Sequence, residues 1–181
     1  MLPFGNNGYA SALERNVTIV TPQDVFLASF SLHPAGVAVI TGLRDDGTPV
    51  GFTATSLASF SSTPPRASFN IAQHASSFDA IAIGKTLLLH LLASDQIDLA
   101  RTMAGDSRER FVGNHWEPGL GGLPQLVGVR AKLLATIVAV TPVGENAAVV
   151  VEIQGGQTHP DRPSLVYVER RYHVVGDAIS D

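Results

Sequence analysis

The sequence contains no cysteine. Disulfide bonds, thiolate metal sites and cysteine nucleophiles are therefore excluded by composition alone. Charged residues are also scarce, at 15% of the 181 residues, and the 12 Lys and Arg are outnumbered by 16 Asp and Glu. Because no dense basic run could follow a phosphate backbone, we do not expect nucleic acid as a partner.

Long apolar runs are missing as well. No segment reaches the roughly 18 apolar residues that a membrane-spanning helix requires, and the first residues lack the features of a signal peptide. We therefore expect a cytoplasmic protein with no membrane partner. Hydrophobic residues still make up 45% of the chain, which is typical of a compact globular protein. We predict an N-terminal arm over residues 1–20 and one domain over residues 21–181.

Several catalytic motifs are absent too. The six histidines show neither HxH nor HExxH spacing, so we expect no metal site. His90 alternates with leucines and is interpreted as a structural or interface histidine. The chain has no G-x-S-x-G elbow, glycine-rich Rossmann fingerprint or Walker loop.

What is present is mostly β-structure. Periodicity and turn residues predict strands over residues 36–43, from 49 onward, and over 67–72, 86–92, 127–143, 147–153, 165–168 and 172–175. Arg44-Asp45-Asp46-Gly47-Thr48 is predicted to form the hairpin turn between the first two of these strands. Three helices are predicted: one that begins at Thr21-Pro22 and ends at His33-Pro34, a short one that Ser76 or Ser77 caps and that ends at Gly84, and one over residues 94–104. Many strands with few helices favour a closed or nearly closed barrel over a βαβ sheet.

The most unusual segment is the run from Thr53 to Thr63, in which seven of eleven residues carry a hydroxyl group. Alternation predicts one strand with a polar and an apolar face, which Pro64-Pro65 would end. The polar face has two possible explanations. It is either a water-exposed edge, or a surface whose small hydroxyl groups hydrogen-bond a heteroaromatic ring and a phosphate.

Four motifs follow one another in this part of the chain: Thr53-Ala54-Thr55-Ser56, Ser59-x-Ser61-x-x-Pro64-Pro65, Ser76-Ser77-Phe78-Asp79-Ala80-Ile81 and Arg110-Phe111. Their order resembles the flavin reductase family, and the resemblance extends from about residue 24 to 175. It implies a mainly β fold with short helices, an FMN-binding split β-barrel of the Greek-key type. It also implies a homodimer in which two subunits build the flavin sites together.

The resemblance implies the site residues as well. The isoalloxazine and ribityl chain would contact residues of the hydroxyl run, namely Thr53, Ala54, Thr55, Ser56, Ser59 and Ser61. Ser76 and Ser77 would receive the flavin phosphate, although simple helix capping explains them equally well. Arg110 and Phe111 would lie at the flavin edge, or would belong to a loop that aromatic residues anchor.

The activity implied is hydride transfer from NADH or NADPH to FMN or FAD, with the reduced flavin supplied to a partner monooxygenase. This chemistry needs no protein nucleophile, because nicotinamide and flavin react with each other. Two alternatives stay open: a flavoprotein of the same fold that carries electrons or only binds flavin, and a structural module without a ligand.

One departure from the family concerns the nicotinamide. Many flavin reductases have Gly-Asp-His in the turn between two long late strands, with the histidine facing the nicotinamide, whereas this chain has Gly144-Glu145-Asn146. The candidates for facing the nicotinamide are therefore Asn146 and Tyr172. We expect weak binding of NAD(P)H, because an amide cannot carry the charge of an imidazole.

Overall fold

The computed structural model describes residues 21–176, so the predicted N-terminal arm lies outside the described residues. The chain divides into two units, residues 1–33 and 34–181. In the first unit, helix α2 (Pro22–Ser31) begins where the sequence predicts: Thr21 is the N-cap, and its hydroxyl accepts a hydrogen bond from the Asp24 N–H at 3.2 Å. No helix in the described part of the chain is long and apolar enough to cross a membrane.

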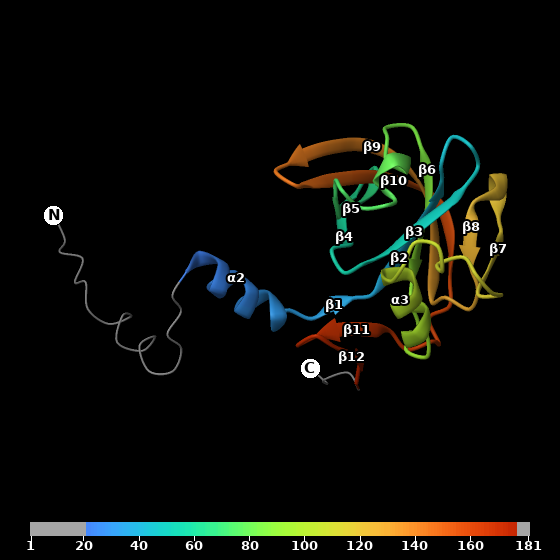
Figure 1. Cartoon of the computed structure of the whole chain (residues 1–181). Helices are drawn as coiled ribbons and strands as arrows, with labels where there is room; N and C mark the ends of the chain where they lie inside the picture. The colour runs from blue at the N-terminus through green and yellow to red at the C-terminus, as the bar shows by residue number, and fades with distance from the viewer. Residues whose placement is uncertain (1–20, 177–181) are drawn as a thin grey trace, which may run out of the picture. The chain divides into compact units, whose positions relative to one another are not determined.

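The second unit is built from antiparallel strands (Figure 1). Its largest sheet has the order β3-β2-β6-β9-β10-β5-β4 and consists of β2 (Ala38–Leu43), β3 (Pro49–Ala54), β4 (Ala58–Ser62), β5 (Pro65–Ala72), β6 (Thr86–Leu91), β9 (Ala131–Val143) and β10 (Asn146–Thr158). Two smaller sheets consist of β1 (Ala35–Gly36), β11 (Leu165–Val168) and β12 (Arg171–Val174), and of β7 (Trp116–Pro118) and β8 (Pro124–Leu126). Three short helical segments complete the unit: η1 (Phe78–Ala80), α3 (Ile97–Ala104) and η2 (Leu120–Gly122).

The large sheet curves around one hydrophobic core. Buried side chains from six of its strands form a single cluster that includes Ile40, Ala54, Phe69, Leu87, Ala135, Ile137 and Val149. Strands β3 and β5 lie far apart in the strand order, yet Phe52 and Phe69 approach to 5.9 Å between ring centroids. The sheet is therefore an incomplete barrel with β3 and β4 as its edges. A second buried cluster joins α3 to the smaller sheets through Val37, Leu92, Met103, Leu126 and Leu165.

Several element boundaries differ from the prediction: β10 extends to Thr158 rather than residue 153, β5 begins at Pro65 rather than residue 67, and the short helix predicted to end at Gly84 is only the 3-10 segment η1. Two further differences have a visible cause. Strand β9 begins at Ala131 rather than residue 127, because Gly128 has a φ of 68° and the Val127 N–H donates to the His115 carbonyl. Helix α3 begins at Ile97 rather than residue 94, because Ala93 forms a bridge to Ser164 and the Ser94 N–H donates to Pro163. In both cases a backbone N–H near the predicted start of the strand or helix donates to a carbonyl of a distant segment instead.

The hydroxyl run is not one strand, so its predicted alternation over residues 53–63 is wrong. The chain leaves β3 after Ala54 and enters β4 at Ala58, and these two strands are opposite edges of the large sheet. A register shift between Ser59 and Ser61 breaks the alternation again inside β4. Alternating polarity cannot show where a chain crosses from one sheet edge to the other. The end of the strand before Pro64-Pro65 is confirmed, since β4 ends at Ser62.

His90 is confirmed as a structural histidine of the core. It lies on β6 and is fully buried; its Nε2 accepts a hydrogen bond from the Leu126 N–H, and its Nδ1 lies 3.2 Å from the Val39 carbonyl. The Leu126 bond requires an unprotonated Nε2, so the hydrogen is on Nδ1 and is donated to Val39. Burial, with a smaller contribution from the charge of Lys132, lowers the pKa of His90 to about 4.

This buried histidine predicts a loss of stability in mild acid. An unfolded histidine binds a proton below about pH 6.5, whereas His90 in the folded chain binds one only below about pH 4. The neutral, buried His90 therefore stabilises the fold fully above pH 6.5. As the pH falls to 4, this contribution to the free energy of unfolding is lost, and the full pKa shift corresponds to about 3 kcal/mol. Urea unfolding between pH 7.5 and pH 4 measures it.

The control separates His90 from the other titrating groups. His90→Gln should flatten this pH dependence, whereas His74→Gln, at an exposed position, should retain it. An NMR titration in which the His90 ring of the folded wild-type protein is protonated near pH 6.5 would contradict the prediction.

Candidate functional site

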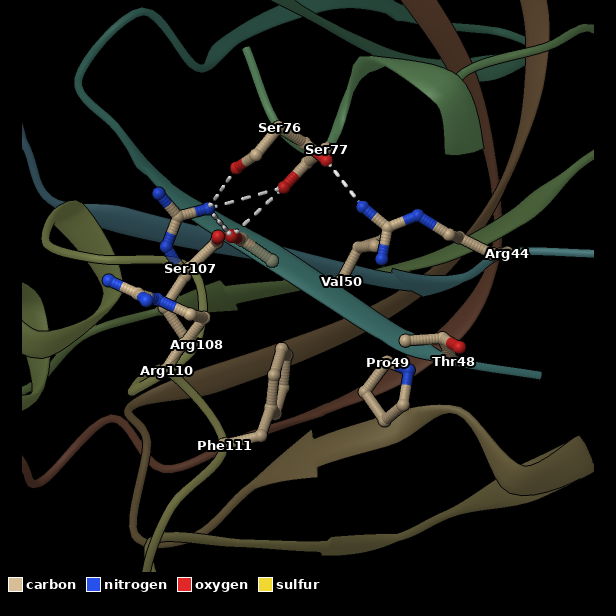
Figure 2. A pocket seen from close by; sticks show the side chains of 11 residues that line it. Arg44, Thr48, Pro49, Val50, Ser76, Ser77, Ser107, Arg108, Arg110 and Phe111 are labelled. Atoms are coloured by element: carbon tan, nitrogen blue, oxygen red, sulfur yellow. Dashed lines mark hydrogen bonds between the residues drawn. The ribbon is translucent and has the colours of Figure 1, made fainter. Parts of the chain in front are cut away.

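A cavity of about 340 Å³ opens beside strand β3. Figure 2 shows its lining side chains, with Arg44 on one side of Val50 and with Arg108 and Arg110 on the other. The lining residues are Arg44, Thr48, Pro49, Val50, Gly51, Ser76, Ser77, Ser107, Arg108, Arg110 and Phe111. Three segments distant in sequence thus converge: the β2–β3 hairpin, the segment before η1 and the loop after α3.

The backbone carbonyl of Gly51 joins these segments. It accepts hydrogen bonds from the Ser77 hydroxyl at 3.1 Å and from Arg110 Nη1 at 2.7 Å. A glycine fits closely here: a Cβ at this position would lie 2.6 Å from the flexible end of Met103, at Cε, and 3.1 Å from Phe111 Cζ, so both side chains would have to shift. Ser77 itself is buried. Its hydroxyl makes no cap bond to η1, so the predicted capping role is not seen.

Arg110 is the cation of the cavity with the largest number of hydrogen bonds to neighbouring segments. Its Nε and Nη2 donate to the Gly105 carbonyl at 3.2 and 2.8 Å, which orients the guanidinium. Nη1 lies 3.2 Å from the Ser76 hydroxyl and 3.3 Å from the Ser77 hydroxyl (Figure 2). Partial burial lowers the pKa of Arg110, but an arginine remains charged at any physiological pH. One positive charge and two hydroxyl groups therefore meet at one point.

Two further arginines line the same cavity. Arg44 Nε donates to Asp79 at 2.6 Å and its Nη2 donates to the Ser76 carbonyl at 2.5 Å, so the guanidinium also holds the Ser76 segment in place. Arg108 pairs with Asp106 at 2.5 Å, and its hydrogen bonds lower the pKa of that carboxyl group to about 2. The Arg108 side chain is 84% exposed. Three guanidinium groups around two serine hydroxyls favour binding of a phosphate group.

The loop that carries Arg110 is anchored by aromatic residues. Phe111 and Trp116 contact edge to face at 5.3 Å between centroids, and Trp116 Nε1 donates to the Phe111 carbonyl at 2.8 Å. A His115 ring nitrogen lies 2.8 Å from the Arg110 carbonyl. Phe111 also lines the cavity. The loop is therefore anchored by aromatic residues and also forms part of the cavity wall.

The structure brings together four of the predicted site residues, Ser76, Ser77, Arg110 and Phe111. The other predicted flavin contacts, Thr53, Ala54, Thr55, Ser56, Ser59 and Ser61, lie outside this cavity. Three of their hydroxyl groups bond to the backbone of the chain: Thr53 donates to Ala100 at 2.8 Å, Ser56 accepts from the Asn70 N–H at 2.9 Å, and Ser61 donates to Pro64 at 2.6 Å. These bonds explain part of the hydroxyl content without a ligand.

The two nicotinamide candidates lie in different sheets and outside the cavity. Asn146 is exposed at the start of β10, after a turn with Gly144 at a φ of 57°, so the predicted turn between the two long strands is confirmed. Gln73 Nε2 donates to the carbonyls of Gly144 at 2.8 Å and Asn146 at 3.2 Å. Tyr172 lies on β12 against Tyr167, with their ring centroids 5.0 Å apart.

Sequence reasoning missed the other seven lining residues, Arg44, Thr48, Pro49, Val50, Gly51, Ser107 and Arg108. Arg44 lies in a predicted hairpin turn, and nothing local distinguishes it from any other turn residue. Arg108 stands two residues before the Arg110-Phe111 motif, so the density of arginines in that loop was an available signal. Within residues 21–176, no three His, Asp or Glu side chains are placed so that they could hold a metal ion.

Known proteins are similar to this chain in sequence and in fold. Residues 30–176 match the model of the flavin reductase like domain, and the chain belongs to this family. An NADH:FMN oxidoreductase of Rhodococcus erythropolis is 36% identical over 154 residues, which cover 82% of this chain and 79% of that protein. The reductase component of a 4-hydroxyphenylacetate 3-monooxygenase of Pseudomonas aeruginosa is 28% identical over 83% of this chain and 91% of that protein.

A solved structure confirms the fold. The crystal structure of a flavin reductase domain protein from Arthrobacter sp. FB24 superposes with a TM-score of 0.81 and 39% sequence identity, and covers 88% of this chain and 99% of that one. Together with the open seven-stranded sheet, this likeness confirms the predicted mainly β split barrel.

Proposed function

We propose that this chain is a flavin reductase that passes hydride from NADH or NADPH to FMN or FAD and supplies the reduced flavin to a partner monooxygenase. The observation that carries this proposal is the cavity in which Arg110, Ser76 and Ser77 converge, in a chain of the flavin reductase family. The curated relatives include an NADH:FMN oxidoreductase and a monooxygenase reductase component.

The residues of the cavity fit the phosphate end of a flavin. FMN carries a dianionic phosphate, and the cavity offers the guanidinium groups of Arg44, Arg108 and Arg110 with the hydroxyl of Ser76. No carboxylate belongs to the lining that the structure describes, although Asp79 and Asp106 pair with two of the arginines. Charge-assisted hydrogen bonds of this kind are roughly twice as strong as neutral ones. The ring of the flavin would then extend toward the hydroxyl run.

The protein's own task is binding and orientation. A bound flavin supplies the hydride acceptor, so the chain needs no nucleophile or metal of its own. Arg110 and Ser76 would hold the phosphate, and the Gly51 carbonyl keeps Arg110 and Ser77 in position. Thr55 and Ser59, both exposed, can donate to the polar edge of the ring. Orientation alone can supply a large part of the rate enhancement in such a reaction.

We also propose that the working form is a homodimer. Strand β4, which carries Ser59 and Ser61, is an exposed edge of the large sheet, and Phe60 beside them is 60% exposed. A second copy over this edge would cover the phenylalanine and would enclose the ring of the flavin. Light scattering that gives the mass of one chain under assay conditions would contradict the dimer.

Steady-state oxidation of NADH and NADPH with added FMN and FAD tests the activity. The proposal predicts turnover that depends on added or bound flavin. A purified protein that binds flavin but oxidises neither nucleotide would be an electron carrier or a flavin-binding module of the same fold. A protein that binds no flavin would support the structural module.

The serines of the cavity provide a direct test of the phosphate site. Ser76→Ala removes an exposed hydroxyl and should weaken FMN binding by about 1.5 kcal/mol, roughly ten-fold, the value for one hydrogen bond to a charged group. Ser77→Ala should also weaken it, because the Ser77 hydroxyl supports Gly51. Fluorescence titration with FMN measures both, with Ser31→Ala on α2 as the control. Unchanged affinity in both variants would place the phosphate elsewhere.

The turn at Asn146 should limit the use of NADH. If Asn146 faces the nicotinamide, Asn146→His should lower the KM for NADH and introduce a pH dependence near 6.5, because an imidazole titrates there. Glu145→His places an imidazole one residue away in the same turn. It should neither lower the KM for NADH nor introduce the pH dependence. Equal behaviour of the two variants would mean that Asn146 does not face the nicotinamide.

A further inference from the structure

An acid beside the phosphate cavity binds one of the arginines that line it. Asp106 follows Gly105, the C-cap of helix α3, and its carboxylate accepts hydrogen bonds from Arg108 Nε at 3.1 and 3.2 Å and from Nη2 at 2.5 Å. Its Oδ1 also accepts the backbone N–H of Arg108 at 3.0 Å. Arg108 lines the cavity, whereas Asp106 does not. The carboxylate can therefore compete for Arg108 with any anion that enters the cavity.

The three arginines of the cavity differ in how firmly they are held. Arg110 donates to two backbone carbonyls, and Arg44 donates to one carbonyl as well as to a carboxylate. Within residues 21–176, the Arg108 guanidinium donates to Asp106 alone, and its side chain is 84% exposed. In Figure 2 the Arg110 guanidinium points toward Ser77, whereas that of Arg108 points away from it. Arg108 is therefore the cation that can change its position most easily.

The pair of Asp106 and Arg108 is easy to break, because ion pairs between exposed side chains contribute little to stability. A dianionic phosphate beside Arg110 is therefore able to draw the Arg108 guanidinium into the cavity. Asp106 opposes this step in two ways, since it competes for the same guanidinium and its negative charge repels the phosphate. The charge is present throughout the neutral pH range, because hydrogen bonds from Arg108 lower the pKa of Asp106 to about 2.

We propose that Asp106 weakens the binding of the flavin phosphate by holding Arg108 away from it. This inference rests on the proposed function, because the cavity must hold that phosphate. A reductase that supplies reduced flavin to a second protein has to release the flavin, and an acid that competes for one arginine speeds this release. Asp106 is then a positioning residue that acts through Arg108. Its effect is on how long the flavin stays bound rather than on the transfer of hydride.

Asp106→Asn tests the inference, because it removes the charge and leaves an oxygen that can still accept the Arg108 N–H. The variant should bind FMN roughly three- to five-fold more tightly than wild type, which corresponds to the upper range for one exposed ion pair. Riboflavin, which has no phosphate, should bind as it does to wild type. Stopped-flow measurement should show that FMN dissociates more slowly by a similar factor. Damage to the loop would weaken binding of FMN, so a gain in affinity cannot come from a structural defect.

Two further variants show whether the effect passes through Arg108. Asp98→Asn removes the same charge from an exposed acid of α3 that pairs with Arg101 outside the cavity, and it should leave FMN binding unchanged. Arg108→Gln should weaken FMN binding more strongly in the Asp106→Asn background than in the wild-type background. The reason is that the guanidinium is free to reach the phosphate once the competing carboxylate is gone.

The inference and the proposed phosphate site are judged by different measurements. An Asp106→Asn protein that binds FMN no more tightly than wild type would overturn the inference, and so would an equal gain in Asp98→Asn. The site is judged by the preference of wild type for FMN over riboflavin and by the loss of that preference in Arg110→Gln. If the preference is present and Asp106→Asn gives no gain, the site stands and the inference fails. If wild type shows no preference, both fail.

Discussion

Replacement of Arg110 by Gln should weaken binding of FMN roughly 10- to 100-fold, about 1.5–3 kcal/mol, while binding of riboflavin changes little. FMN and riboflavin differ only in the phosphate, so the ratio of their affinities isolates the interaction with that group. Arg110 is the cation that lies between Ser76 and Ser77, which makes it the largest single contributor. Fluorescence titration of both flavins against wild type and variant measures the ratio.

Two controls separate the phosphate contact from a structural effect. Arg110→Lys keeps the charge and should restore part of the preference for FMN, although a lysine cannot reproduce the paired hydrogen bonds to Gly105. Arg101→Gln removes an exposed arginine of α3 that lies outside the cavity and should leave the ratio unchanged. Equal losses of FMN and riboflavin affinity in Arg110→Gln would mean that the residue supports the fold rather than the phosphate.

Replacement of Gly51 by Val should lower both the free energy of unfolding and the affinity for FMN. Its Cβ would lie 2.6 Å from Met103 Cε and 3.1 Å from both Phe111 Cζ and the Ile40 carbonyl, so the added atoms must push aside the end of Met103 and press on Phe111, which lies in the loop that carries Arg110. Overpacking of this kind costs about 1–3 kcal/mol. Valine is otherwise favourable in a strand, so the lost stability would report the missing space. Urea unfolding and FMN titration measure the two effects.

Gly36→Val is the matched control, because a Cβ at Gly36 of β1 meets nothing within 4 Å. It should unfold like wild type and bind FMN normally. A Gly51→Val protein that behaves like the Gly36→Val protein would show that the close packing between β3, Met103 and Phe111 is unimportant for the site.

Local signals predicted much of the fold. The residues Thr21 and Pro22 place the start of α2, and the Arg44-Asp45-Asp46-Gly47-Thr48 turn places the β2–β3 hairpin, because capping and turn chemistry act over a few residues. The hydroxyl run failed as a single strand, because the crossing from β3 to β4 is decided by the closure of the barrel. Alternation describes a strand but not which sheet edge the strand joins.

The site was predictable only where a motif marks it. Ser76, Ser77, Arg110 and Phe111 were found through their order along the chain, and the structure brings them to one cavity. Arg44 was missed because its partners, Ser76 and Asp79, lie more than thirty residues away and its own turn gives no hint of them. Gly51 was missed because its role depends on the side chains of Met103 and Phe111, which only the folded chain places against it.

The central claim is that the flavin phosphate binds in the cavity between β3, the Ser76-Ser77 segment and the loop of Arg110. A crystal structure of the protein with FMN tests it most directly. We predict phosphate oxygens within hydrogen-bonding distance of the Arg110 guanidinium and the Ser76 hydroxyl. A bound FMN whose phosphate lies elsewhere, with the arginine cavity left to solvent, would contradict the claim.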